Sequence, residues 1–320
     1  MHPSGNRAKR ACVRRDEAEH WRPVTSPTVP RRRLGQELIR IRRAAGLTGE
    51  QVAAAMEWSS TSKLYKIEGG RQGIQVKELR ELLGRYGVTD AATIEALSTL
   101  ARQGKQRAWW TQHVEAMPDS YATYLGLESG ASELRVYEPN VIHGLLQTES
   151  YARAFFQTVA KHAPKPAAAL AQAEGKIKIR LERQALLTRE TPLSLWIVQD
   201  EASLRRIIGG PDVMAEQYDR LIEVSRLPSV KLQVLPLRDS ANPAPPTNFA
   251  IIEFDPESDL DIVYIELLIG SIFVEGKDVR RYNVQFDNLR AAALSPSQSR
   301  RLIEDLARGV GRADTGRDVA

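Results

Sequence analysis

Cysteine is almost missing from this chain of 320 residues, and its single thiol is Cys12. One thiol excludes an internal disulfide and any metal site that needs several cysteine ligands. Long apolar runs are missing too, because no window approaches the roughly 18 continuous apolar residues of a transmembrane helix. The first thirty residues lack the apolar segment of a secretory signal. These absences predict a cytoplasmic protein with no membrane partner.

The usual signatures of catalysis and cofactor binding are also missing. His113, His143 and His162 do not fall at metal-ligand spacing, and no Gly-x-Ser-x-Gly elbow or phosphate-cradling glycine loop occurs. Asp200 and Glu201 are adjacent, so their side chains point to different faces, and we favour a helix-capping role for them over acid–base chemistry. The sequence therefore predicts a protein that binds rather than catalyses, with no cofactor and no metal.

Positive charge is concentrated in the first third of the chain. Residues 1 to 110 hold 21 Lys and Arg against 11 Asp and Glu, whereas the remainder holds 24 against 29. A localised positive field raises both the affinity and the association rate for a phosphate backbone. We therefore expect the N-terminal part of the chain to meet nucleic acid.

The first thirty residues combine many arginines with several prolines and few apolar side chains. This composition cannot bury a core, so we expect a disordered basic tail over residues 1–30. A basic arm of this kind can follow DNA phosphates or enter a minor groove. A solvated tail without a site is the better interpretation.

The stretch from residue 47 to residue 56 carries the start signals of a helix. Thr48 is a suitable N-cap, and Gln51 completes a capping box in which each side chain accepts a hydrogen bond from the other residue's backbone amide. Val52 and Ala53 then fall on a buried face. We expect a helix that begins after Thr48 and serves mainly as a scaffold.

A second helix signature follows after a tight turn. Leu64 and Ile67 are spaced to form a buried edge, Trp58 before them is a core residue between the two helices, and Gly69-Gly70 ends the helix. The outward side chains carry the hydroxyl and cationic groups that contact bases and phosphates in a major groove. The predicted DNA contacts are Thr48, Ser60, Thr61, Ser62, Lys63, Tyr65, Lys66 and Arg71. The plainer alternative is that the two lysines belong to an ordinary solvated face.

Two such helices joined by a turn form a helix-turn-helix, and residues 34 to 105 resemble its xenobiotic-response-element (XRE) type, also called lambda-repressor-like or Cro-type. The residues that carry the resemblance are Leu34, Gly35, Arg43, Leu47, Thr48, Ala53, Ser59, Lys63, Ile67, Glu68 and Gly70. The resemblance implies a mainly α five-helix bundle over residues 31–106, with further helices at 76–86 and 91–103. It also implies a homodimer that binds double-stranded DNA.

The chain departs from this family pattern in two places. Gly49 stands where the family often has a Gln that touches a phosphate, and one extra residue separates Met56 from Ile67.

Beyond a predicted linker at residues 107–119, helices and strands are mixed over residues 120–308, and a disordered tail is expected at 309–320. Helical periodicity covers residues 120–136, 147–159, 167–187, 278–293 and 297–308. Strand-like apolar runs occupy residues 193–199, 230–236, 249–254 and 262–267. Strands grouped between helices predict an α+β domain whose sheet is largely antiparallel.

An ordered set of motifs runs through this second region. It comprises Glu138-Pro-Asn-Val-Ile-His-Gly-Leu-Leu-Gln-Thr148 with Tyr151-Ala152, then residues 180–187, 200–210, 233–236, 264–266 and 286–296. The set resembles the domain that follows the helix-turn-helix in a large actinobacterial regulator family with the motif Val-Pro-Gly-Leu-Leu-Gln-Thr. Here His143 replaces the proline. The resemblance implies an antitoxin-like transcriptional regulator, often encoded beside a small partner protein.

The motif residues read as mostly structural. Residues 144 to 148 are typical of a tight turn that enters a helix, with Thr148 as the N-cap. A pocket for a small acidic ligand or a partner peptide could be lined by Gln147, Tyr151, Arg180, Arg183 and Gln184. The alternative, which we favour, is an internal salt-bridge network in which the arginines pair with acidic strand residues such as Glu266.

These observations predict a sequence-specific DNA-binding transcriptional regulator whose C-terminal domain senses a ligand or binds a partner. A second hypothesis is an antitoxin-like protein that binds a small protein encoded by a neighbouring gene and regulates its own operon. A third, an enzyme hidden in the C-terminal domain, has no catalytic constellation to support it.

Overall fold

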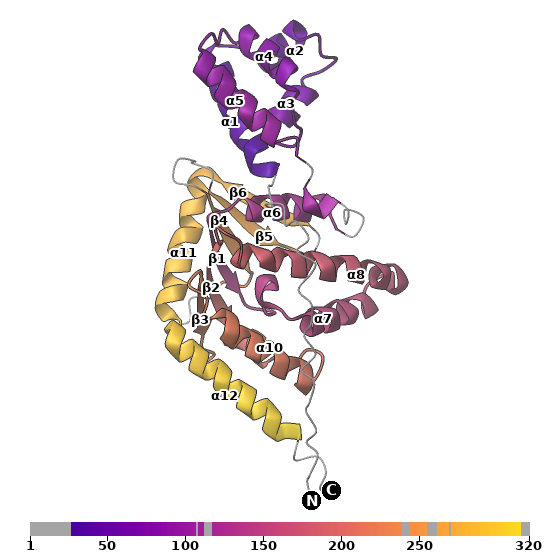
Figure 1. Ribbon diagram of the computed structural model, residues 1–320, viewed down its shortest axis with the longest axis vertical. Coiled ribbons are helices and arrows are strands. Elements are labelled where there is room, and N and C mark those ends of the chain that lie inside the picture. Colours follow the sequence, from indigo (N-terminus) through magenta and orange to yellow (C-terminus); the bar gives the residue numbers. More distant parts are fainter. Residues whose placement is uncertain are drawn as a thin grey trace, which may run out of the picture.

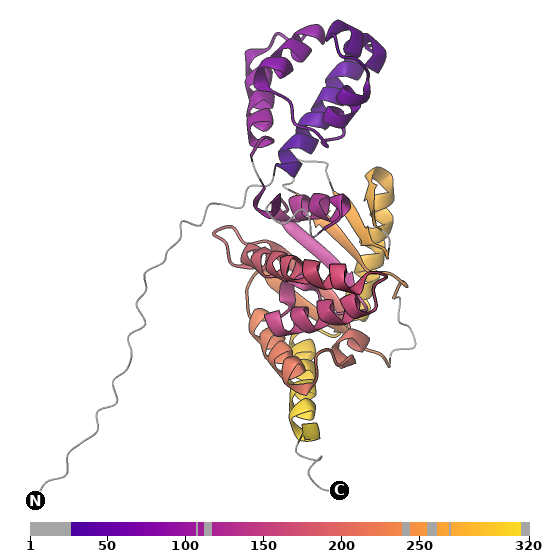
Figure 2. The same cartoon turned by 90° about the vertical axis from the view of Figure 1, so that its right-hand side faces the viewer.

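The computed structural model describes residues 27–106, 108–111, 117–238, 244–254, 261–268 and 270–314, with side chains as far as residue 309. Residues 1–26 of the predicted basic tail lie outside these ranges, as do Cys12, His113 and part of the predicted linker. Figure 1 shows a helical unit formed by α1 to α5 and a larger unit built around a sheet, and Figure 2 shows the two stacked end to end.

The helical unit contains α1 (Thr28–Ala44), α2 (Gly49–Ala55), α3 (Ser62–Glu68), α4 (Val76–Arg85) and α5 (Ala91–Gln103). The capping box predicted for α2 is confirmed. The Gln51 amide donates to the Thr48 hydroxyl at 3.3 Å, and the Thr48 amide donates to the Gln51 side chain at 2.9 Å. The prediction of disorder is wrong for residues 28–30, because Val29 in the first turn of α1 is buried against the other unit.

One apolar cluster holds the helical unit together. Leu34 and Leu38 of α1 meet Leu64 and Ile67 of α3, and the side chains of α4 and α5 close the cluster from the other side. Leu64 is fully buried, which confirms the buried edge predicted for this helix.

Six strands form one sheet in the second unit, in the order β3-β2-β1-β4-β5-β6. They are β1 (Glu133–Glu138), β2 (Ser194–Asp200), β3 (Val230–Leu235), β4 (Phe249–Glu253), β5 (Ile262–Glu266) and β6 (Ser271–Glu275). β1, β2 and β3 are parallel, whereas β1–β4, β4–β5 and β5–β6 are antiparallel pairs. The sheet is therefore mixed, which corrects the prediction of a largely antiparallel one.

The prediction of a largely antiparallel sheet failed because β1, a parallel partner of β2, was not recognised in the sequence, and β6 was not recognised either. The helical pattern assigned to residues 120–136 covers both α6 (Asp119–Ser129) and β1, and residues 271–275 carried no strand prediction although they form β6. The crossovers between the parallel strands consist of α7 (Glu149–Lys161) and α8 (Pro166–Arg183), then α9 (Glu201–Arg205) and α10 (Pro211–Val224). Parallel neighbours need long connections of this kind.

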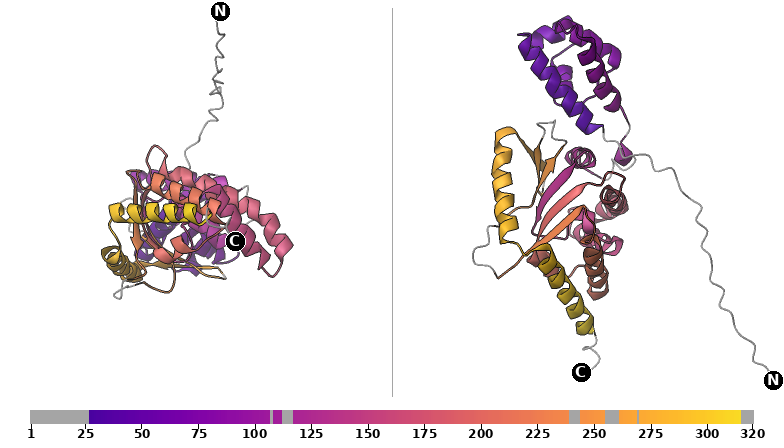
Figure 3. Two further views of the ribbon diagram at one scale, coloured as in Figure 1. Left: turned by 90° about the horizontal axis from the view of Figure 1, so that it is seen from below. Right: turned by 60° about the vertical axis from the view of Figure 1, so that its left-hand side comes forward.

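Helices cover both faces of the sheet (Figures 1 and 3). α6, α7, α8, α10 and α12 (Pro296–Asp314) lie on one face, and α11 (Val279–Ala292) lies on the other. Alternate residues of β2 supply the two cores, because Leu195 and Ile197 pack under the first set while Val198 packs with Phe286 of α11.

The C-terminal helix and the apolar character of the helices test two further expectations. α12 continues to Asp314, so the tail predicted from residue 309 is helical for its first six residues. None of the described helices has the length and apolar character needed to cross a membrane.

Leu64→Ala is expected to lower the free energy of unfolding of the helical unit by about 2–5 kcal/mol, because it leaves a cavity where a fully buried side chain was. Urea denaturation followed by circular dichroism measures the change. Lys66→Ala, at an exposed position of the same helix, is the control and should change the free energy by less than about 0.5 kcal/mol. Equal losses in the two variants would contradict the packing of α3.

Candidate nucleic-acid interface

The turn between α2 and α3 has a strained backbone. Glu57 has a φ of 55° and is the one non-glycine residue with positive φ in the described ranges. The amides of Glu57 and Trp58 donate to the carbonyls of Ala54 and Ala53 at 3.1 and 2.8 Å, which closes α2 with a Schellman motif.

Six of the eight predicted DNA contacts are exposed, in or beside α2 and α3. The exposed members are Thr48, Ser60, Ser62, Tyr65, Lys66 and Arg71. Thr61 is half-buried at the N-cap of α3, where its side chain makes no capping hydrogen bond. Lys66 and Arg71 form no ion pair with any described residue, so their charges remain available to an anionic partner.

Lys63 lies differently from the prediction. Its ammonium group forms an ion pair with Glu78 of α4 and lies 4.8 Å from the ring centroid of Trp58, whose Nε1 donates to the same carboxylate at 3.2 Å. The Lys63 side chain is 37% exposed, but its charge is paired, and the lysine braces α3 against α4. The sequence alone could not reveal this pair, because its members are 15 residues apart.

Gly49 makes room for Tyr65. A Cβ atom at Gly49 would lie 2.5 Å from the Tyr65 hydroxyl oxygen, so position 49 accepts no larger residue while the ring stays in place. The tyrosine is 49% exposed. The absence of a side chain at Gly49 thus leaves space at the start of α2, and the Tyr65 hydroxyl group of α3 fills this space.

A buried ion pair fixes the far end of α3. Arg42 of α1 donates from Nε and Nη2 to the two carboxylate oxygens of Glu68 at 2.6 and 2.9 Å, and from Nη1 to the Leu47 carbonyl at 3.0 Å. The arginine and glutamate side chains are 12% and 5% exposed. Hydrogen bonding to Glu68 raises the pKa of Arg42, so the guanidinium stays charged. Neither residue was among the predicted contacts, although they hold those contacts in place.

The five predicted pocket residues do come together in the second unit, around the turn at residues 142–148. The Gln147 side chain donates to the Ile142 carbonyl at 2.6 Å and accepts from Arg180 Nη1 at 3.0 Å. Gln184 donates to the Gln147 carbonyl at 2.6 Å, and the Tyr151 hydroxyl accepts from the Ile142 amide at 3.2 Å. These contacts are internal, which supports the network rather than the pocket.

Arg183, the fifth of these residues, is the centre of a buried charge cluster. Its Nε and Nη2 donate to Glu128 of α6 at 2.7 and 2.6 Å, and its Nη1 donates to the Tyr121 hydroxyl at 2.7 Å. The Tyr124 hydroxyl donates to the same carboxylate at 2.7 Å. The acidic partner is therefore Glu128, and the prediction of Glu266 is wrong because that residue is at the exposed end of β5.

Polar motif residues also cap helices. Thr148 caps α7 and Asp200 caps α9, as predicted, by accepting backbone amides at 3.2 and 2.9 Å. His143, in place of the family's proline, accepts from the Leu145 amide at 3.4 Å at the start of η2 (Gly144–Leu146). Burial, with the nearby arginine charges, lowers the pKa of His143 well below its ordinary value, so this ring is neutral.

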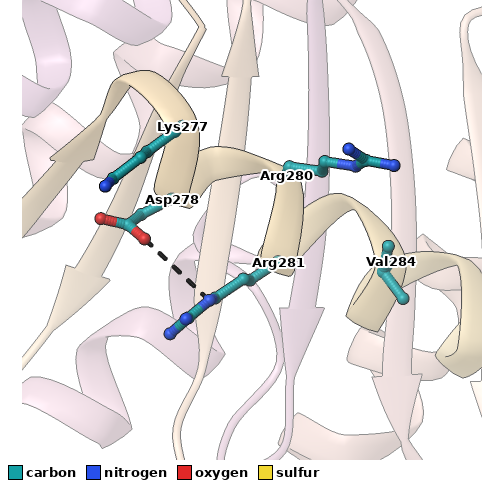
Figure 4. Close-up of a pocket in the computed structure, with 5 residues that line it drawn as sticks. All are labelled: Lys277, Asp278, Arg280, Arg281 and Val284. Carbon is teal, nitrogen blue, oxygen red and sulfur yellow. Dashed lines mark ion pairs between the residues drawn. The ribbon is translucent and has the colours of Figure 1, made fainter.

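A shallow surface depression of about 530 Å³ lies at the start of α11 (Figure 4). Its lining residues are Lys277, Asp278, Arg280, Arg281 and Val284. All five side chains are exposed, and Figure 4 shows the ion pair between Asp278 and Arg281. The depression thus holds no buried polar group. Within the described ranges, no set of three or more His, Cys, Asp and Glu side chains is placed to hold a metal ion.

Comparison with known proteins gives two matches. Residues 33–97 match a family described as a helix-turn-helix domain. Residues 121–305 match a family described as a domain of unknown function, DUF5753. No curated protein and no solved structure matches the chain.

Glu138→Gln is expected to remove a pH dependence of stability. Burial raises the pKa of Glu138 from its ordinary value to about 7, so the folded protein holds this proton more tightly than the unfolded chain does. Stability is thus favoured below the unfolded pKa of about 4.3 and falls as the pH rises toward 7. Denaturation at pH 5 and pH 8 should show a smaller fall in the variant than in wild type. Glu133→Gln, on the same strand, is the control and should keep the wild-type fall.

Glu128→Ala is expected to destabilise the second unit by about 3–5 kcal/mol, because it leaves the buried Arg183 charge without its partner. Thermal and urea unfolding measure the loss. Glu149→Ala removes one member of the surface ion pair with Arg153 and should lose no more than about 1 kcal/mol. Similar losses in both variants would show that Glu128 is not structurally essential.

Proposed function

The chain belongs to the DUF5753 family, which covers more than half of its length, and a helix-turn-helix domain precedes this region; from this we propose that it is a sequence-specific DNA-binding transcriptional regulator. The observation that carries the proposal is the exposed surface of α2 and α3, where hydroxyl groups and the cations of Lys66 and Arg71 gather around a helix held in a fixed direction. Such a helix enters the major groove while its partner crosses the backbone. Regulation then follows from binding, with no catalytic step and no cofactor.

We assign different roles to the contacts within this surface. Ser62, Tyr65 and Lys66 lie on the exposed face of α3 and would meet base edges and nearby phosphates. Thr48 and Arg71, at the two ends of the helix pair, would contact the backbone. Lys63 contributes less, because its charge is already paired with Glu78.

The XRE-type, lambda-repressor-like assignment and the actinobacterial origin belong to the same proposal. The capping box at Thr48 and the buried Arg42–Glu68 pair support a module of this type, because they set the angle between α2, α3 and α1. Modules of this type usually bind two half-sites as symmetric dimers, and we propose a homodimer that acts in the cytoplasm on chromosomal DNA.

A second candidate function is an antitoxin-like one, in which the C-terminal domain binds a small protein encoded by a neighbouring gene. Exposed apolar side chains on the β5–β6 hairpin favour it, because Leu267, Leu268 and Ile272 are 40%, 103% and 47% exposed. Neighbouring exposed apolar side chains can mark a protein–protein contact. Co-purification with the product of the neighbouring gene tests this function. A complex that forms only on DNA would argue against it.

Selection from random double-stranded DNA, followed by footprinting on the enriched sequence, tests the DNA-binding function. An enriched motif that the full chain protects from cleavage is expected. Recovery of unrelated sequences with no protected region would contradict the proposal.

Variants of the surface test the contact assignment. Lys66→Ala and Arg71→Ala should each weaken binding to the selected site and lower the slope of log K against log salt by about 0.9 for each phosphate that the variant no longer neutralises. Lys63→Ala should have the smallest effect of the three, since its charge is already neutralised. Arg102→Ala on α5, paired with Glu95, is the charge-matched control. A larger effect at Lys63 than at Lys66 would show that α3 is docked differently.

A further inference from the structure

The first turn of α1 is anchored in the second domain. Val29 is 7% exposed and belongs to the apolar core under the sheet, not to the core of the helical unit. Thr28 and Val29 lie against two glycines, because a Cβ atom at Gly126 would come within 1.9 Å of Thr28 and one at Gly130 within 2.6 Å of Val29. These two glycines form a socket for the start of α1, since neither position has room for a side chain.

The same helix continues into the helix-turn-helix domain. Leu34 and Leu38 are buried in the core of that domain, and Arg42 pairs with Glu68 at the end of α3. The 17 residues of α1 span about 25 Å at 1.5 Å per residue. α1 is therefore one continuous element shared by the two domains, with its first turn in one and its last turns in the other.

Arg32 connects the second domain to the end of α3. Its guanidinium forms a 2.5 Å ion pair with Glu275 of β6 and lies 5.9 Å from the ring centroid of Phe273. The main chain and the stem of the same residue pack against Gly70, where a Cβ atom would come within 2.7 Å of the Arg32 Cγ and 3.0 Å of its Cα. Gly70 belongs to the turn that ends α3 and precedes Arg71. One residue thus contacts both β6, through its guanidinium, and the turn at Gly70, through its main chain and stem.

The ion pair is placed where it can be broken without unfolding either domain. The Glu275 side chain is 50% exposed, and exposed ion pairs contribute little to global stability. β6 ends the strand order, so no further described strand pairs with its outer edge. A cavity of about 1190 Å³ opens here between the domains, and Arg31, Arg32, Arg71 and Glu275 are among its lining residues.

We propose that Arg32 is the positioning residue through which the C-terminal domain sets the direction of the recognition helix. The glycine socket is the fixed pivot of α1, and the Arg32–Glu275 pair holds the turn at Gly70. An event at the edge of β6 that removes Glu275 from the pair releases this turn and lowers the affinity for DNA. The inference rests on the proposed DNA-binding function and names its regulation.

A charge-swap cycle on the full chain tests the coupling. Arg32→Glu and Glu275→Arg should each weaken binding to the selected DNA by about fivefold or more, and the double variant should recover most of the loss. The result for Glu275→Arg is the discriminating one, because added positive charge alone would strengthen binding to DNA. Glu37→Arg adds the same charge to α1, where Glu37 pairs with the exposed Arg40 of the same helix, and should not weaken binding.

Hydrogen exchange without DNA gives a second readout. The amides of Arg71 and Gln72 donate to the Lys66 carbonyl at 2.9 and 3.1 Å. Both should exchange faster in Glu275→Arg than in wild type, while the amides of α10 keep their wild-type rates and show that the domain is folded. Glu275→Gln, a milder change, should shift the same amides in the same direction.

The outcomes separate the coupling from the DNA-binding function. Tight binding by wild type with unchanged or stronger binding by Glu275→Arg overturns the coupling and leaves the DNA-binding function intact. Loss in Arg32→Glu that Glu275→Arg fails to rescue means that Arg32 contacts DNA directly, and this also overturns it. Unchanged exchange at residues 71 and 72 overturns it even for a chain that binds no DNA, whereas failure of wild type to bind any selected DNA counts against the function itself.

Discussion

The direction of a seven-residue helix depends on the arginine that holds its end. A helix as short as α3 does not keep its shape or its orientation alone. Arg42 binds Glu68 at the end of α3 and the Leu47 carbonyl just before α2, so one guanidinium fixes three helices at once. The exposed side chains of α3 form a defined surface because this contact and the apolar core around Leu64 hold the helix against α1.

The second domain also contains a buried arginine–glutamate pair, and there it joins α8 to α6. Arg183 and Glu128 are buried between α8 and α6, and the tyrosines of α6 complete their hydrogen bonds. A buried pair adds little net stability compared with apolar packing, but its geometry is demanding, so it selects one arrangement among several. In this domain the arrangement so fixed includes α6, and α6 carries a glycine that receives the start of α1. The buried Arg183–Glu128 pair therefore also helps to position the contact between α6 and α1 that joins the two domains.

The sequence predicted what depends on neighbouring residues and missed what depends on distant ones. The capping residues Thr48, Thr148 and Asp200 were correct, because a cap acts within three residues of itself. The exposure of most α3 contacts also followed from helical spacing. The brace between Lys63 and Glu78, the partner of Arg183 and the parallel strand β1 could not be read this way, since each depends on how separate elements pack. The five pocket candidates lie near one another as expected, but their hydrogen-bond partners, such as Glu128 for Arg183 and the Ile142 carbonyl for Gln147, follow only from the packing.

The close fit between Gly49 and Tyr65 has a consequence for sequences related to this one. A side chain at position 49 would occupy the volume that the Tyr65 phenol now fills, so a larger residue there requires the half-exposed ring to move aside. A relative with a larger residue at position 49 should therefore carry a smaller or differently placed side chain at position 65. The two positions would then appear as a covarying pair in an alignment.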